Sequence, residues 1–180
     1  MPLVRLFLVL LFCAGAARAE GIVVKNAELA LDEEERYVLN AEFQFAFNAT
    51  LEEALQHGVP LYFTLEFELR RPRWYWVDES LSSQQFTYRV TYQALTRQYR
   101  LSSGLYSQNV ATLDDVSRLL ERVRGRPVIE KALLQKGVAY EAALRFKLDV
   151  AQMPKPFQLS ALGSPDWNLQ SDWRRWTLTP

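Results

Sequence analysis

Apolar and polar residues alternate with a period of two along most of this chain. Between residues 37 and 47 every odd position is apolar, whereas Asn40, Glu42 and Gln44 occupy even positions. Because successive side chains of a strand point to opposite faces, this pattern predicts strands with one buried and one exposed face. The alternating segments predict strands at residues 22–31, 37–47, 61–70, 86–93, 98–102, 138–150 and 176–178.

One segment between the strands switches to helical spacing after residue 48. Thr50 can cap a helix, since Glu53 lies three residues later and completes a capping box. Asn48 is the alternative cap. Gly58 follows the apolar stripe and is expected to end this helix.

A second helix is predicted from Thr112, where Asp115 again lies three residues after the cap. Apolar residues at spacings of three and four extend this pattern to Val123. We expect Gly125 and Pro127 to end the helix, because glycine and proline commonly follow a helical C-terminus. Residues 128–135 are predicted to form a short helical turn.

The gaps between the predicted strands are mostly of hairpin length, which predicts antiparallel pairing. Sheets that are apolar on one face must bury that face against another layer. We therefore predict a mainly β fold with a minor α contribution: an antiparallel β-sandwich, or a curled sheet, with two short helices. Since no repeat, low-complexity tract or linker divides the chain, residues 20–180 are expected to form a single domain.

Residues 1–19 have the pattern of a secretory signal peptide. Arg5 precedes an apolar run at residues 6–12, and Ala17, Arg18 and Ala19 form a small-x-small cleavage site. We predict cleavage after Ala19 and a periplasmic location, with membrane contact only during export, since the run is far shorter than the roughly 20 residues that span a bilayer. Cleavage would also remove Cys13, the only cysteine, so no disulfide is expected in the mature chain.

Charge and composition argue against several classes of function. Lysine and arginine number 21, as do aspartate and glutamate, so the chain lacks the basic excess typical of nucleic-acid binding. The only histidine, His57, is expected at the end of the first helix, and one histidine cannot supply a Cys/His zinc set. The glycines are scattered and form no phosphate loop. We therefore predict no enzymatic activity, no catalytic residue, no metal site and no cofactor.

Two carboxylates lie on the same face of one predicted strand. Glu66 and Glu68 are two residues apart, which on a strand places them roughly 7 Å from one another. That spacing matches a glycosidase pair, but any polar strand face with acids two residues apart gives it. With Arg70 on the same face and Arg89 expected on a neighbouring strand, we interpret the acids as solvated cross-strand charges.

Trp74, Tyr75 and Trp76 form an aromatic cluster in an irregular segment. Consecutive residues on a strand cannot all face the core, so at least one is expected to meet solvent, another chain or a ligand. Tryptophan and tyrosine are favoured at contact hot spots. Together with Arg97 in the predicted turn at residues 94–97, these three residues are our predicted partner-binding residues.

Several segments resemble the exported proteobacterial family catalogued as domain of unknown function 4390. The likeness covers nearly the whole mature chain, and its most specific parts are the turn at residues 94–100 and the tryptophan-rich end. The segments are residues 61–69 with Trp74-Tyr75-Trp76, residues 92–101, Leu148-Asp149, Met153-Pro154-Lys155-Pro156, and Trp167-Asn168-Leu169 through Trp176. The family has no established reaction, so the resemblance implies no catalytic residue. Its gene neighbours imply an association with a membrane sensor kinase.

Two hypotheses of different classes follow. The first is a non-catalytic periplasmic interaction module that docks to the outer domain of a membrane sensor kinase or to another envelope protein. The alternative is a carrier of a small apolar ligand or lipid, with the aromatic faces lining a cavity between the sheets. A packed interior would favour docking, whereas a dry aromatic cavity would favour carriage.

Overall fold

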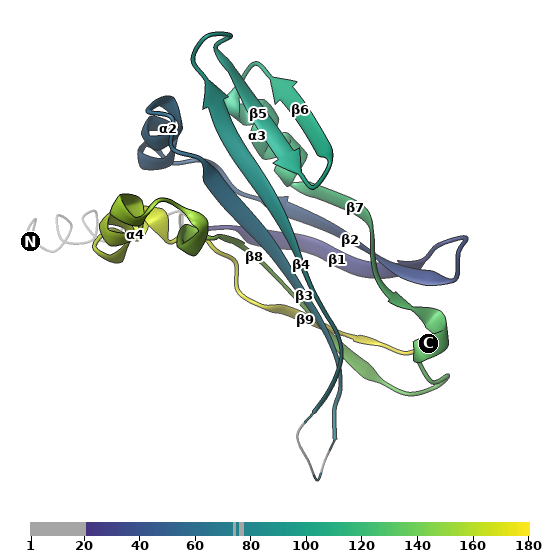
Figure 1. The fold of residues 1–180 in the computed structure, drawn as a ribbon. Coiled ribbons are helices and arrows are strands. Elements are labelled where there is room, and N and C mark those ends of the chain that lie inside the picture. The colour runs from purple at the N-terminus through teal and green to yellow at the C-terminus, as the bar shows by residue number, and fades with distance from the viewer. Residues whose placement is uncertain (1–20, 74, 76–77) are drawn as a thin grey trace, which may run out of the picture.

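Nine β-strands form two antiparallel sheets in the computed structural model, which describes residues 21–73, 75 and 78–180 (Figure 1). The predicted signal peptide, Trp74 and Trp76 lie outside these described residues. The three-stranded sheet has the order β1 (Val23–Leu31), β2 (Arg36–Gln44), β7 (Arg122–Glu130). The six-stranded sheet has the order β6 (Tyr106–Val110), β5 (Gln98–Ser103), β4 (Glu79–Gln93), β3 (Leu61–Arg71), β8 (Tyr140–Leu148), β9 (Arg174–Leu178).

The alternating pattern explains which strand faces are buried. On β3 the odd positions from Leu61 to Leu69 are completely buried, and they face the layer formed by the smaller sheet. Phe43 of β2 and Phe146 of β8 meet between the sheets with ring centroids 4.9 Å apart. The prediction of a mainly β, antiparallel fold is therefore confirmed, in the form of two packed sheets.

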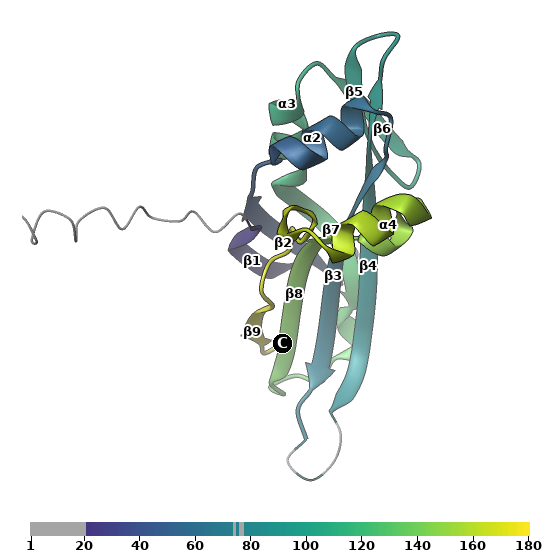
Figure 2. The ribbon, with the colours of Figure 1, turned by 90° about the vertical axis from the view of Figure 1, so that its left-hand side faces the viewer.

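Three short α-helices accompany the sheets in the described part of the chain: α2 (Ala49–Gln56), α3 (Leu113–Leu120) and α4 (Lys155–Leu162). Single 3-10 turns occur at η2 (Lys131–Leu133), η3 (Val150–Gln152) and η4 (Pro165–Trp167). Helices α2 and α3 lie together at one end of the molecule, opposite the end at which β3 and β4 pair through Arg71 and Glu79 (Figure 2). Across residues 21–73, 75 and 78–180, no helix combines the length and apolarity needed to cross a bilayer.

The first predicted helix is present, but its preferred cap was wrong. The side chain of Asn48 accepts a hydrogen bond from the backbone N–H of Leu51 at 2.9 Å, so Asn48 is the N-cap. Thr50 lies inside the helix and donates its hydroxyl to Asp166 Oδ2 at 2.8 Å. In contrast, the capping box of α3 between Thr112 and Asp115 is formed as predicted. His57 is the C-cap of α2, as expected.

The end of the second helix was predicted wrongly. Helix α3 ends at Leu120, and Val123, Gly125 and Pro127 all belong to β7. Gly125 has a φ of +62° at an irregularity of the β2–β7 register, where two β7 residues stand opposite one residue of β2. Glycine at a bulge and proline on an edge strand are both compatible with a sheet, so here they mark a bulged strand. Of the turn predicted at residues 128–135, only η2 is helical.

Three further elements differ from the predictions. Strand β6 and helix α4 were not predicted, and β4 begins at Glu79 where a start at residue 86 was expected. The missed part of β4 is rich in serine and glutamine and lacks alternation, yet it pairs with β3. Helix α4 has no fully buried residue, and Phe157 and Ala161 pack against the core only in part, so its apolar stripe is too weak to be recognised in the sequence.

The bulge at Gly125 leads to the first testable prediction. A Gly125→Ala substitution is expected to lower the free energy of unfolding by about 1–2 kcal/mol, because a residue with a Cβ is strained in the left-handed region. Backbone strain is the only cost, since a Cβ at this position would meet no atom within 4 Å. Urea unfolding would measure the change.

Gly163→Ala is the matched control for this substitution. Gly163 ends α4 with a φ of −104°, and its added Cβ would meet only the carbonyl oxygen of Ser160 at 4.0 Å. We expect this control to change stability by no more than about 0.5 kcal/mol. An equal effect of both substitutions would show that the bulge conformation does not cause the loss.

Candidate functional site

The β3–β4 hairpin carries the residues that the sequence singled out. The two strands pair as far as Arg71 and Glu79, and this end of β3 and β4 extends beyond the neighbouring strands (Figure 1). Strand β8 accompanies β3 only to Arg70, which pairs with Glu141. The paired ends of β3 and β4 therefore lie at one extremity of the molecule.

Two contacts hold the base of the β3–β4 turn. The Arg73 guanidinium lies 2.5 Å from Glu79 Oε2, and the Arg73 backbone N–H donates to Asp78 Oδ1 at 3.3 Å. Tyr75 lies between these contacts in the sequence, and 66% of its surface is exposed. The prediction that at least one aromatic residue of the cluster meets solvent is thus confirmed for Tyr75, while Trp74 and Trp76 lie outside the described residues.

Arg97 lies at the opposite end of the same hairpin strand. It is an exposed residue of the β4–β5 turn with a φ of +53°. Strand β4 has 15 residues, which at a rise of 3.3 Å per residue puts its two ends about 50 Å apart. The structure therefore does not bring Tyr75 and Arg97 into one surface, and a partner of ordinary size would contact only one of them.

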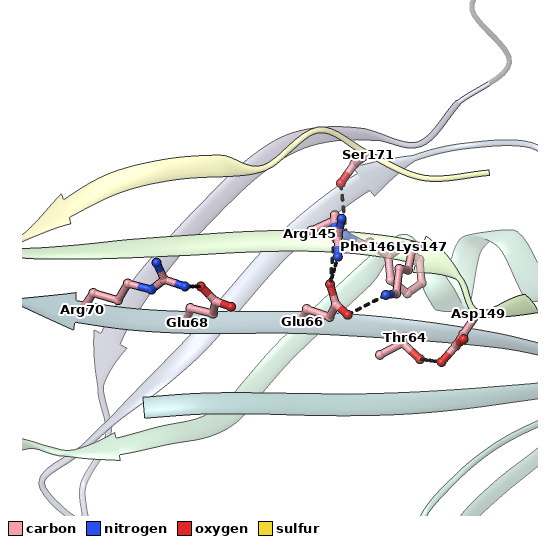
Figure 3. A network of polar contacts seen from close by, with 9 residues as sticks. All are labelled: Thr64, Glu66, Glu68, Arg70, Arg145, Phe146, Lys147, Asp149 and Ser171. Atoms are coloured by element: carbon pink, nitrogen blue, oxygen red, sulfur yellow. Dashed lines mark hydrogen bonds and ion pairs between the residues drawn. The ribbon is translucent and has the colours of Figure 1, made fainter. Parts of the chain in front are cut away.

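A second candidate is a group of charges on the outer face of the six-stranded sheet (Figure 3). We call Glu66, Arg145 and Lys147 the Glu66 network. Glu66 Oε2 lies 2.5 Å from Arg145 Nη2, and Glu66 Oε1 lies 2.7 Å from Lys147 Nζ. The Glu66 side chain is only 12% exposed, so this carboxylate is largely buried between two cations.

The environment of Glu66 sets its protonation state. Burial raises the pKa of Glu66, but the hydrogen bonds and the charges of Lys147 and Arg145 lower it by more. The pKa of Glu66 is therefore below the ordinary value of 4.5. A general acid near neutral pH needs a raised pKa. Glu66 is instead a permanent carboxylate at neutral pH, which fits a structural ion pair.

The Glu66 network also contacts the C-terminal segment. The Arg145 guanidinium stacks on Trp173, with Cζ 4.7 Å from the ring centroid. Next to it, the backbone N–H of Phe146 donates to Ser171 Oγ at 3.1 Å, and the Ser171 N–H donates to the Phe146 carbonyl at 2.9 Å. The network therefore helps to fasten residues 169–173 along β8.

This arrangement corrects one sequence-based interpretation. Glu66 was expected to be a solvated cross-strand charge, with Arg89 across from it; it does pair across strands, but with Arg145 and Lys147 of β8 and with only 12% of its side chain exposed. Glu68 keeps the expected solvent exposure, but its partner lies on its own strand, since its Oε2 lies 2.6 Å from Arg70 Nη2. Arg89 instead lies over the ring of Tyr62, 5.9 Å from the centroid. No sequence signal could have identified Arg145, because it lies 79 positions from Glu66 and meets it only through the strand order.

The interior between the sheets is filled by side chains. Phe63 and Phe146 are completely buried, and Phe45 packs against both with ring centroids 5.7 and 6.1 Å away. One surface hollow of about 930 Å³ lies beside the β1–β2 turn, and charged residues such as Glu34, Arg36 and Lys131 line it. Such a lining does not suit an apolar ligand.

The described residues contain no cluster of three or more His, Cys, Asp or Glu side chains that could hold a metal ion. Asp149 comes closest to a polar centre, since it accepts hydrogen bonds from Thr64 at 3.4 Å and Gln152 at 2.7 Å. These contacts connect η3 to β3, and both donors to the Asp149 carboxylate are neutral side chains.

Comparison with known protein families identifies the family of this chain. The model of the family described as "Domain of unknown function (DUF4390)" matches residues 19–177. No curated protein and no solved structure matches the chain.

Proposed function

The chain belongs to the DUF4390 family, a domain of unknown function, and we propose that it is a non-catalytic interaction module of the cell envelope. It docks a protein partner through the turn of the β3–β4 hairpin. The partner suggested by the family resemblance is the outer domain of a membrane sensor kinase. Export by the N-terminal leader, with a periplasmic location, is part of the same proposal and rests on the sequence of residues 1–19.

The observation that supports docking is the exposed ring of Tyr75 on a turn with a fixed base. The Arg73–Glu79 ion pair and the Asp78 carboxylate hold the chain on either side of the ring. Buried tyrosines often dominate binding energy at interfaces, so one such residue can anchor a partner.

The filled interior supports docking over carriage of an apolar ligand. A carrier needs a cavity between its sheets, whereas here Phe43, Phe45, Phe63 and Phe146 occupy that space with mutual ring contacts. An apolar ligand of useful size would have to displace these rings, at a cost of several kcal/mol. Function through surface contact requires no such change.

A binding measurement with two matched variants tests this proposal. We expect Tyr75→Ala to weaken binding of residues 20–180 to the purified sensor-kinase outer domain at least tenfold, since removal of a hot-spot tyrosine costs about 2 kcal/mol or more. The double variant Trp74→Ala, Trp76→Ala is expected to weaken binding to the sensor-kinase outer domain further. Biolayer interferometry would measure the dissociation constants.

Arg97→Ala is the control, because it removes a large exposed side chain at the far end of β4. It is expected to leave the dissociation constant within twofold of the parent. Equal losses for Tyr75→Ala and Arg97→Ala, or unchanged binding for Tyr75→Ala, would contradict docking at the β3–β4 turn.

A further inference from the structure

A cleft of about 370 Å³ opens at the side of the sandwich, between β7, β5 and α3. Three arginines of β7 line it: Arg122, Arg124 and Arg126. Its other walls include the apolar side chains of Leu101 and Leu119. The cleft thus combines cations with apolar surface.

The bulge at Gly125 places the third arginine in the cleft. Arg122 pairs with Glu42, a residue of the outer face of β2, whereas Arg126 pairs with the inward-facing Leu39. Without the bulge, the alternation would turn the Arg126 side chain away from the sandwich interior, whereas Arg122 lines the cleft from its rim. The extra residue directs the Arg126 guanidinium toward the six-stranded sheet, where its Cζ lies 5.6 Å from the ring centroid of Phe86 and 5.7 Å from that of Tyr88.

The positive charge of the cleft is only partly balanced. Arg124 pairs with Glu42, with an Nη2–Oε1 distance of 2.9 Å. Among residues 21–73, 75 and 78–180, no carboxylate lies within 4.0 Å of the Arg122 or Arg126 guanidinium. Two of the three arginines that line the cleft therefore have no carboxylate partner, and an oxyanion bound there would supply the missing countercharge.

We propose that this cleft binds a small organic anion, with a carboxylate or phosphate held by Arg122 and Arg126 and an apolar body packed on Leu101 and Leu119. Arginine presents a planar fork of donors that matches both oxyanions. The volume of 370 Å³ lies within the range of small-molecule sites, about 300–1,000 Å³. It is too small for a lipid with its acyl chains.

Tyr88, which also lines the cleft, adds a polar contact. Burial raises the pKa of the Tyr88 hydroxyl above its ordinary value of 10, and Arg126 opposes this only in part. The hydroxyl therefore stays protonated near neutral pH and can donate a hydrogen bond to the anion.

A titration followed by ¹H–¹⁵N NMR tests the site with phenyl phosphate as the probe, since it carries both an oxyanion and an apolar ring. We expect saturable shift changes centred on residues 101–106 and 122–126. Benzoate distinguishes carboxylate from phosphate recognition, and binding of either anion supports the proposal. Phenol, which lacks the charge, is expected to bind at least tenfold more weakly than the better anion.

Variants locate the interaction. Arg122→Gln and Arg126→Gln are each expected to weaken binding of the better anion at least fivefold. Arg100→Gln is the control, because Arg100 is an exposed arginine of β5 that contacts Asn109 and does not line the cleft. It should change the dissociation constant less than twofold.

Three results would overturn the proposal. The first is a loss of binding in Arg100→Gln as large as in the Arg122 and Arg126 variants, which would indicate that the anions bind to any exposed arginine. The second is phenol binding as tightly as the anions. The third is binding of phosphatidylglycerol vesicles without binding of either small anion, which would indicate a membrane surface. A failure here leaves docking at Tyr75 unaffected, because the two sites share no residue.

Discussion

A Phe146→Ala variant is expected to lose about 3–5 kcal/mol of unfolding free energy, the range for removing a fully buried phenylalanine. Phe146 has no exposed surface, and its ring meets four others in the core. The centroid distances are 4.9 Å to Phe43, 5.8 Å to Phe63, 6.1 Å to Phe45 and 6.2 Å to Tyr88. Truncation would therefore leave a cavity between the two sheets that these rigid rings cannot fill. Urea unfolding at pH 7 would measure the loss.

Two controls accompany this variant. Phe146→Leu retains most of the buried volume and is expected to cost about 1–2 kcal/mol. Tyr106→Ala removes an aromatic ring that is 55% exposed, and surface substitutions of this kind usually change stability by about 0.5 kcal/mol or less. A loss below about 2 kcal/mol for Phe146→Ala would contradict a tightly filled interior and would favour the carrier hypothesis.

A Glu66→Ala variant is expected to lose about 2–4 kcal/mol at pH 7, because removing one member of a buried ion pair leaves its partners uncompensated. Arg145 and Lys147 would then face each other with about a quarter of each side chain exposed, 27% and 26% respectively. The matched control is Glu68→Ala. The side chains of Glu68 and Arg70 are 29% and 47% exposed, more than those of the Glu66 network. Exposed pairs contribute about 0–1 kcal/mol, so a similar loss from both variants would contradict the special role of Glu66.

The pH dependence of stability gives a second readout for Glu66. Its pKa is lower in the folded protein than the ordinary 4.5, so its stabilising contribution is complete above the unfolded pKa and is lost as the pH falls through the folded pKa. Glu66→Gln removes this titration. The parent should therefore lose more stability than Glu66→Gln between pH 6 and pH 3, and parallel curves for the two proteins would contradict the assigned ion pairs.

The sequence predicted the parts of the fold in which pattern and environment agree. Strands β2, β3 and β8 alternate because one face of each packs into the shared core, and burial follows the alternation. Strand β7 departs from this pattern: its sequence from Arg122 contains three arginines, Gly125 and Pro127, and its bulge interrupts the side-chain period. Local preferences therefore favoured a helix end there, and tertiary pairing with β2 determined the outcome.

The candidate sites were predictable to different degrees. Exposure of an aromatic residue near Tyr75 followed from strand geometry alone, since consecutive side chains cannot all be buried. The Glu66 network and the arginine cleft depend on contacts between distant segments: Glu66 meets Arg145 because β3 neighbours β8, and Arg126 meets Tyr88 because β7 lies across from β4. Strand order and register determine both, and a single sequence does not encode them in a readable form.

Photo-crosslinking in the intact cell envelope tests docking at the β3–β4 turn most directly. A benzophenone amino acid would replace Tyr75 in one variant and Arg97 in another, and mass spectrometry would identify the covalent adducts. We predict one protein adduct, the outer domain of a sensor kinase, at position 75 and none at position 97. Adducts at position 97 alone, or a lipid adduct at position 75, would contradict docking through the hairpin turn.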